Sequence, residues 1–177
     1  MNRPDDDALS PTARLFVGLW PDDETRQALH DHQALWQWGR SAVPTRRERL
    51  HMTLHFLGDW PRELVPALVQ GLAVPFEPFT LRLDDAGVWR NGIARVGPVE
   101  PPAPLLALHH RLALALARLG LVPASGRFAP HVTLARGAAQ AMPPRRPPSI
   151  VWPVAGYALV ESDLRPPASY RIRAVYG

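Results

Sequence analysis

The segment His-x-Thr-Leu occurs twice in this sequence, as HMTL at 51–54 and as HVTL at 131–134. With 7 histidines among 177 residues, chance would place two such segments in roughly one sequence in two thousand, so the repeat requires a common explanation. Both segments are short and mostly apolar apart from the histidine and the threonine, which indicates strands. Two strands that each present a histidine and a threonine are therefore the starting point for any chemistry.

Four polar side chains of these segments are candidates for a reactive centre. Side chains alternate between the faces of a strand, so His51 and Thr53 share one face, as do His131 and Thr133 on the second strand. If the strands face each other, one imidazole can take a proton from water while the other protonates a leaving oxygen. The two hydroxyls can donate hydrogen bonds to nonbridging phosphate oxygens, and Arg136 can add a charged donor. This set fits phosphodiester chemistry.

Two side chains near the first segment are candidate substrate contacts. By alternation His55 shares the face of His51 and Thr53, where it either touches a ribose-phosphate backbone or lies at a solvated rim; we favour the rim. Trp20 ends an expected strand and could stack on a base. His51 and His55 also have the spacing of a zinc-protease helix, but strand residues four apart lie ~13 Å from each other, too far to bind one ion. We expect no metal site and no cofactor.

The composition indicates a folded protein that can bind an anion. Its 46% hydrophobic content suffices for a core, and the absence of cysteine excludes disulfides and thiolate catalysis. All 20 Lys+Arg side chains are arginines and the net charge is +4, which either serves phosphate binding or reflects the base composition of the genome. There is no apolar run of about eighteen residues and the start is acidic, so we expect a cytoplasmic protein without a membrane partner.

Strands and helices are expected to alternate around the two motifs. Hydrophobic periodicity and turn residues predict strands at 14–20, 50–57, 79–83, 92–96, 131–135, 154–161 and 170–176, and helices at 21–38, 61–70 and 105–119. The strands at 79–83 and 92–96 are expected to pair, because the turn-forming Asn91 and Gly92 lie between them. The order resembles a loose duplication. It predicts an α+β fold with two pseudo-symmetric lobes, whose antiparallel or mixed sheets face a central cleft and whose helices lie outside. Residues 1–177 should form one bilobal domain, with 1–12 disordered.

The chain resembles the two-histidine, HxTx-motif phosphoesterases, and among them the RNA 2′,3′-cyclic phosphodiesterases once called 2′-5′ RNA ligases. The segments that carry the resemblance are RLFVGLWPDDETRQAL (14–29), LHMTLHFLGD (50–59), LHHRLALALARLGL (108–121), FAPHVTLAR (128–136) and LVESDL (159–164). The resemblance implies that His51 is the proton donor and His131 the proton acceptor, and that Thr53, Thr133 and Arg136 bind phosphate. It also implies metal-independent hydrolysis of RNA 3′ ends with a 2′,3′-cyclic phosphate, tRNA fragments being one source, to 2′-phosphomonoesters. Reverse 2′-5′ ligation and a monomeric state are further expectations.

The lead into the first motif, VPTRRER at 43–49, differs from the Pro-rich, Asn-containing segment that is frequent in this family. Arginines here and at 145–146 form either a phosphate track or a solvated face, and we favour the solvated face. His109 and His110 are expected at surface or boundary positions of the Leu-rich helix, and His30 and His32 likewise at the end of the first helix. Two alternative functions stay open: a phosphodiesterase for a small nucleotide or ADP-ribose cyclic phosphate, and an RNA-binding module without catalysis, although the latter does not explain the twin motifs.

Overall fold

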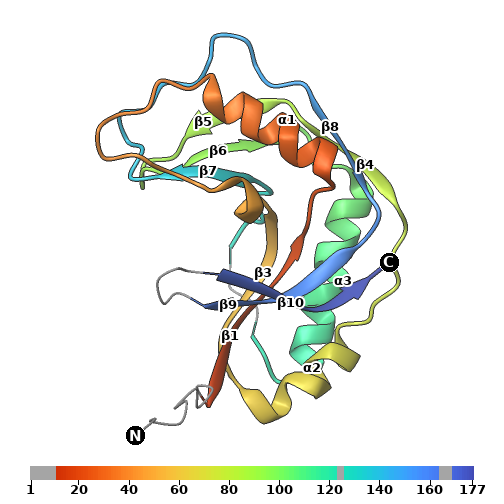
Figure 1. Ribbon diagram of the computed structural model, residues 1–177. Coiled ribbons are helices and arrows are strands. Elements are labelled where there is room, and N and C mark those ends of the chain that lie inside the picture. Colours follow the sequence, from red (N-terminus) through yellow and green to blue (C-terminus); the bar gives the residue numbers. More distant parts are fainter. Residues whose placement is uncertain (1–10, 123–125, 164–168) are drawn as a thin grey trace, which may run out of the picture.

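The computed structural model describes residues 11–122, 126–163 and 169–177, which form an antiparallel sheet structure with helices packed on its outer side (Figure 1). The strands are β1 (Thr12–Leu19), β2 (Val43–Pro44), β3 (Met52–Pro61), β4 (Phe79–Leu83), β5 (Asp85–Val88), β6 (Ala94–Gly97), β7 (Val132–Arg136), β8 (Ile150–Val154), β9 (Tyr157–Asp163) and β10 (Ser169–Tyr176). The helices are α1 (Asp23–Ala34), α2 (Val65–Gly71) and α3 (Ala103–Arg118), with short 3-10 turns at Arg47–Arg49 and Arg62–Leu64.

The main sheet has eight strands in the order β10-β9-β1-β3-β7-β6-β5, with β2 paired to β7. It divides into two lobes of four strands, because its two motif strands, β3 and β7, pair only through Met52 and Val132. The lobes lie one above the other in Figure 1, with β10, β9, β1 and β3 in the lower lobe and β7, β6, β5 in the upper. The predicted α+β fold with two facing lobes is therefore confirmed, and its two motif strands lie at the junction.

Helices cover the outer side of each lobe (Figure 1). Helix α1 lies over the upper lobe, where the buried amide of Gln33 donates from Nε2 to the carbonyl oxygens of Leu134 (2.7 Å) and Thr45 (2.9 Å). Helix α3 lies against the lower lobe through a buried apolar stripe, as its leucine spacing predicted: Leu105, Leu108, Leu112 and Leu116. The helices thus fix the backs of both motif strands and leave their opposite faces free.

Local signals explain where the helices begin and end. The carboxylate of Asp22 accepts a hydrogen bond from the amide of Thr25 (2.8 Å), which is the expected N-cap of α1. Helix α1 ends at Ala34 rather than near residue 38, because the chain turns there to bury Trp36 and stack Trp38 on it. None of the helices in the described part of the chain is long and apolar enough to span a membrane.

The expected pairing of the strands at 79–83 and 92–96 is wrong. Strand β4 pairs instead with β8 in a separate two-stranded ribbon, and β6 pairs with β5, a strand that the sequence reading missed. The strand expected at 154–161 is divided between β8 and β9. Of the segment 1–12 expected to be disordered, residues 1–10 lie outside the described residues, and Thr12 begins β1.

Candidate active site

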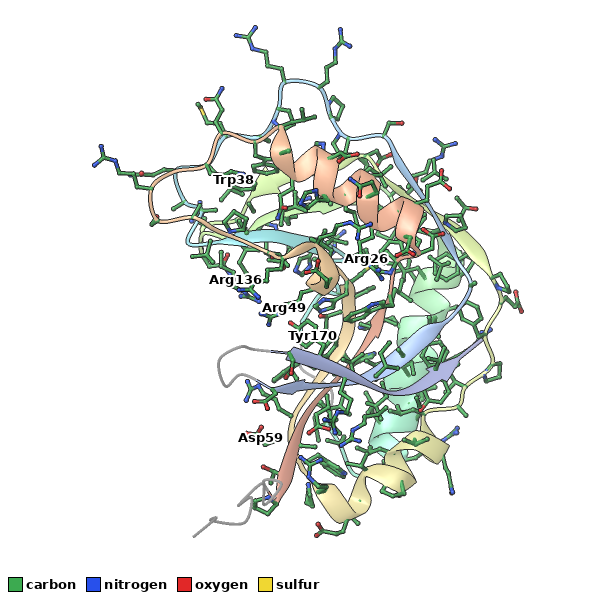
Figure 2. All side chains as sticks on the ribbon, viewed as in Figure 1. Arg26, Trp38, Arg49, Asp59, Arg136 and Tyr170 are labelled. Carbon is green, nitrogen blue, oxygen red and sulfur yellow. The ribbon has the colours of Figure 1, made fainter. Side chains whose placement is uncertain are left out.

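Both motifs open onto one cleft of about 670 Å³ between the lobes. The cleft is strongly cationic, because four arginines and no carboxylate are found among its described lining residues: Arg14, Phe16, Val43, Pro44, Thr45, Arg46, Arg49, His51, Thr53, Phe56, Ile93, His131, Thr133, Arg136, Ser162 and Tyr170. Figure 2 shows Arg49 and Arg136 directed from the upper side toward Tyr170 of the lower lobe. The predicted convergence of two imidazoles, two threonines and Arg136 is therefore present in the structure.

The two imidazoles are held in the same way. Nδ1 of His51 lies 2.7 Å from the carbonyl oxygen of Arg49, and Nδ1 of His131 lies 2.9 Å from that of Ala129, in each case two residues back along the chain. A carbonyl only accepts, so Nδ1 carries the hydrogen and donates it. In the neutral ring Nε2 is then an unprotonated acceptor, and in the charged ring it is a donor. Each histidine can therefore serve either as a base or as an acid through Nε2.

Aromatic rings fix the His51 imidazole further. Trp20 stacks on it at 5.3 Å with an interplanar angle of 15°, Phe16 packs at 4.8 Å, and Tyr170 meets it edge-on at 5.3 Å. Trp20 was predicted as a candidate substrate contact; the structure places it against His51, half-buried and outside the residues that line the cleft. His131 has a single ring neighbour among the described residues, Trp89 at 4.4 Å.

Burial lowers the pKa of both motif histidines from the ordinary 6.5. For His51 burial brings the pKa to about 4, the hydrogen bond to the Arg49 carbonyl opposes this, and the charges of Arg49, His131 and Arg136 lower it further. For His131 burial is again the main cause of the lowered pKa, with Arg95 and Arg136 adding to it against the hydrogen bond to Ala129. The free cleft therefore disfavours a second positive charge, and an anionic ligand would relieve this.

The remaining polar groups of the motifs lie beside the imidazoles. The hydroxyl of Thr53 is 3.2 Å from Nε2 of His51, and Thr133 and Arg136 line the cleft from β7. Arg136 is exposed and leaves its guanidinium available to an anion. Among residues 11–122, 126–163 and 169–177, no group of three or more histidine, aspartate or glutamate side chains could hold a metal ion.

The prediction for His55 is wrong in both of its forms. His55 is only 7% exposed, and its Nε2 donates to the carbonyl oxygen of His109 on α3 at 2.9 Å, while the two rings stack at 4.1 Å. The cause is a bulge in β3: Gly18 pairs with Thr53 but Val17 with His55, so the alternation of faces shifts by one residue. His55 therefore points to the helix, and it is neither a rim residue nor a substrate contact.

Several residues of the cleft escaped the sequence reading. Arg46 and Arg49 were assigned to a solvated face, but both line the cleft, whereas Arg47 donates from Nε to the side chain of Gln27 at 3.1 Å. Phe56 was expected in the core but is 53% exposed in the cleft. Three more came from segments distant in sequence, for which no local signal existed: Arg14, Ser162 and Tyr170. Elsewhere, His32 is buried rather than at the surface.

Known proteins share this sequence and architecture. The model of the 2'-5' RNA ligase superfamily matches residues 21–176. Two relatives are named RNA 2',3'-cyclic phosphodiesterase: one from Thermus thermophilus, 37% identical over 86% of this chain and 83% of its own, and one from Escherichia coli, 33% identical over 95% and 94%. The crystal structure of E. coli LigT complexed with 3'-AMP matches with a TM-score of 0.83 at 30% identity, over 93% of this chain and 97% of that chain. A Thermus thermophilus crystal structure matches with a TM-score of 0.77 at 31% identity, over 92% and 96%. The chain therefore belongs to the 2'-5' RNA ligase superfamily.

Proposed function

We propose that this protein is an RNA 2′,3′-cyclic phosphodiesterase, which hydrolyses cyclic phosphate ends of RNA to 2′-phosphomonoesters. The observation that carries the proposal is the matched pair of imidazoles in one arginine-lined cleft, each with Nδ1 tied to a carbonyl and Nε2 left for substrate. The names of its relatives agree with this activity. A module that only binds RNA would not need two histidines in this arrangement.

The reaction follows from the site in one displacement step. Nε2 of His131 accepts a proton from a water molecule, whose oxygen forms a bond to phosphorus. The bond from phosphorus to the 3′ oxygen breaks, and Nε2 of His51 donates its proton to that oxygen. The product has a free 3′ hydroxyl and a 2′-phosphate. Thr53, Thr133 and Arg136 donate hydrogen bonds to the nonbridging oxygens, which carry extra negative charge at the pentacoordinate stage.

The protonation state of His51 depends on the substrate. With a pKa of about 4 in the free protein, His51 is neutral near pH 7 and holds no proton to donate. A bound cyclic phosphate places a negative charge beside the ring and offsets the charges of Arg49 and Arg136, so the pKa rises. Substrate binding thereby charges the proton donor in the complex that needs it.

Four finer assignments belong to the same proposal. The chain acts as one bilobal domain and as a monomer, it works in the cytoplasm, and its substrates are RNA fragments such as those of tRNA. The same two histidines could run the reverse reaction, joining a cyclic phosphate end to a 5′ hydroxyl, where the equilibrium allows it. Sedimentation of the purified protein, cell fractionation and sequencing of RNA ends in cells that lack the protein test these assignments.

Hydrolysis of a short RNA ending in a 2′,3′-cyclic phosphate tests the central claim. In EDTA, the wild type should release a 2′-phosphate, and His51→Ala or His131→Ala should lower kcat by about 10²- to 10⁴-fold, the usual effect of removing a general acid or base. His110→Ala is the matched control, because His110 is exposed on α3. Full activity in either motif variant would refute the two-histidine mechanism, and a 3′-phosphate product would refute the assigned direction of cleavage.

A further inference from the structure

We propose that Phe56 and Arg14 form a stacking platform for the base of the nucleotide that precedes the cyclic phosphate, so that the protein favours oligonucleotides over cyclic mononucleotides. The inference rests on the proposed function and names a subsite of the same cleft. Phe56 is 53% exposed in the cleft, and the guanidinium of Arg14 lies over its ring, 4.8 Å from the centroid.

The backbone of β3 places Phe56 in the cleft against the usual preference of a phenylalanine for the core. Regular alternation from Thr53 would direct Phe56 to the opposite, buried face. The register of β1 with β3 shifts twice, between Val17 and Gly18 and between Leu15 and Phe16, so Thr53 and Phe56 both face the cleft although they are three residues apart. Bulges beside active sites commonly redirect a side chain in this way. Exposing the ring costs burial, and a ligand that covers it would recover that loss.

The cleft extends from the imidazoles along the lower lobe toward this ring. Gly18 lies opposite Thr53 in the sheet, Phe16 opposite Phe56, and Arg14 opposite Asp59, so the paired strands run from the motif to Arg14. Three residues of strand correspond to ~10 Å, which separates Phe56 from the phosphate-binding threonine by about one nucleotide. Figure 2 shows Asp59 well beyond Arg49 and Tyr170 in this direction. The chain of an RNA 3′ end must leave the site on its 5′ side, and this path offers it a surface.

The chemistry of the pair suits a nucleobase. Bases of single-stranded RNA stack on aromatic rings and on arginine guanidinium planes, with little dependence on sequence because every base has a π face. Arg14 is held in place by Asp59, at 3.5 Å, and its guanidinium already covers one region of the ring. Ser162, beside Arg14 in the cleft wall, adds a hydroxyl for a sugar or phosphate. Aromatic ring, guanidinium and hydroxyl together form a site for one nucleoside.

The test compares two substrates with the same reacting group, adenosine 2′,3′-cyclic phosphate and the dinucleotide ApA that ends in a 2′,3′-cyclic phosphate. The measured quantity is the ratio of kcat/KM for the dinucleotide to kcat/KM for the mononucleotide. Phe56→Ala should lower this ratio about tenfold to hundredfold, as expected for the loss of one stacked base. Phe56→Tyr should restore it, Phe56→Leu should not, and Arg14→Gln should lower it by a smaller factor. Val151→Ala, at an exposed position on β8, is the control.

A third substrate separates stacking from contacts to the backbone. A dinucleotide whose first residue lacks its base should lose the preference in the wild type and lose nothing more in Phe56→Ala. An unchanged substrate ratio in Phe56→Ala, or an equal further loss with the abasic substrate, would overturn the platform. Wild-type protein that hydrolyses neither cyclic phosphate would instead refute the proposed function, and the two failures are therefore distinguishable.

Discussion

The imidazoles of His51 and His131 occupy an environment that resists positive charge before substrate arrives. Burial is the largest cause for the lowered pKa of both, and the arginines that are available to bind phosphate add to it. The same arginines become favourable once an anion lies between them and the rings. The cost of holding four cationic side chains around the cleft therefore appears in the free protein and is relieved in the complex.

This arrangement predicts different pH profiles for kcat/KM and kcat. The profile of kcat/KM reports the free protein, where one histidine must be neutral and the other charged. Because both pKa values lie below 6.5 there, the maximum of kcat/KM should lie on the acid side of pH 6.5. The profile of kcat reports the complex, in which the phosphate raises both pKa values, so its alkaline limb should lie at higher pH. Initial rates between about pH 4 and 9 measure both profiles, and coincident limbs or a maximum of kcat/KM above about pH 7.5 would contradict this account.

The sequence predicted the reacting residues but not the walls around them. His51, Thr53, His131 and Thr133 were identifiable because type and spacing recur within four residues. Phe56 was misassigned, because the bulge that turns it into the cleft arises from pairing with β1 and leaves no signal in β3 itself.

At the scale of elements, strand β6 fixes the loop that precedes His131. A Cβ atom on Gly97 would lie 2.6 Å from the carbonyl oxygen of Pro130, so only glycine permits this close approach of strand and loop. Ala129, the next residue back, provides the carbonyl that orients His131. The position of the proton acceptor therefore depends on the absence of a side chain in the neighbouring strand.

Gly97→Ala should consequently impair catalysis more than folding. The added methyl group has to displace backbone, which typically costs about 1–3 kcal/mol of stability, and the shifted loop should lower kcat about tenfold to hundredfold. Gly87→Ala in the adjacent strand β5 is the matched control, because its nearest neighbour would be the Arg95 side chain at an ordinary 3.8 Å. Kinetics and thermal unfolding of both variants decide the matter; equal kcat values would show that the loop tolerates the shift.

Element positions were more predictable than their partners. The leucine stripe of α3 and the Asp22 cap of α1 are local signals, and both elements formed where expected. The ribbon of β4 with β8 joins residues about seventy positions apart, so no turn between adjacent strands could announce it. The cleft arginines Arg46 and Arg49 were missed for a related reason: which arginines of a loop face inward depends on how that loop crosses the sheet.

Across the whole molecule, histidines with low pKa values make the fold sensitive to acid. Besides His51, His109 has a pKa of about 4, because it is partly buried and lies beside His55 and His110. Its ring is stacked between those of His55 and Phe128, at 4.1 and 3.9 Å. The unfolded chain binds protons at these sites below pH 6.5, whereas the folded chain does not until pH is near 4. Stability is therefore complete above about pH 6.5 and falls as pH decreases from about 6.5 to 4.

Urea unfolding at about pH 7 and pH 5 tests this dependence. The free energy of unfolding should be smaller at the lower pH, and His109→Phe, which keeps a ring in the stack but cannot be protonated, should reduce the difference between the two values. His110→Phe is the control, because its exposed ring has no such stack among the described contacts. A pH dependence unchanged by His109→Phe would mean that other groups govern the acid sensitivity.

The single backbone pairing between the lobes, Met52 with Val132, also has a mechanical consequence. Each catalytic histidine immediately precedes one of these residues, and each phosphate-binding threonine immediately follows. Points next to a pivot move least when two bodies rotate about it. A change in the angle between the lobes would therefore swing the distant rim, near Val43 and Ser162, through a wide arc, while the two imidazoles kept their spacing. Bulky and slender RNA ends could then enter the same enzyme without disturbing the alignment of its proton donor and acceptor.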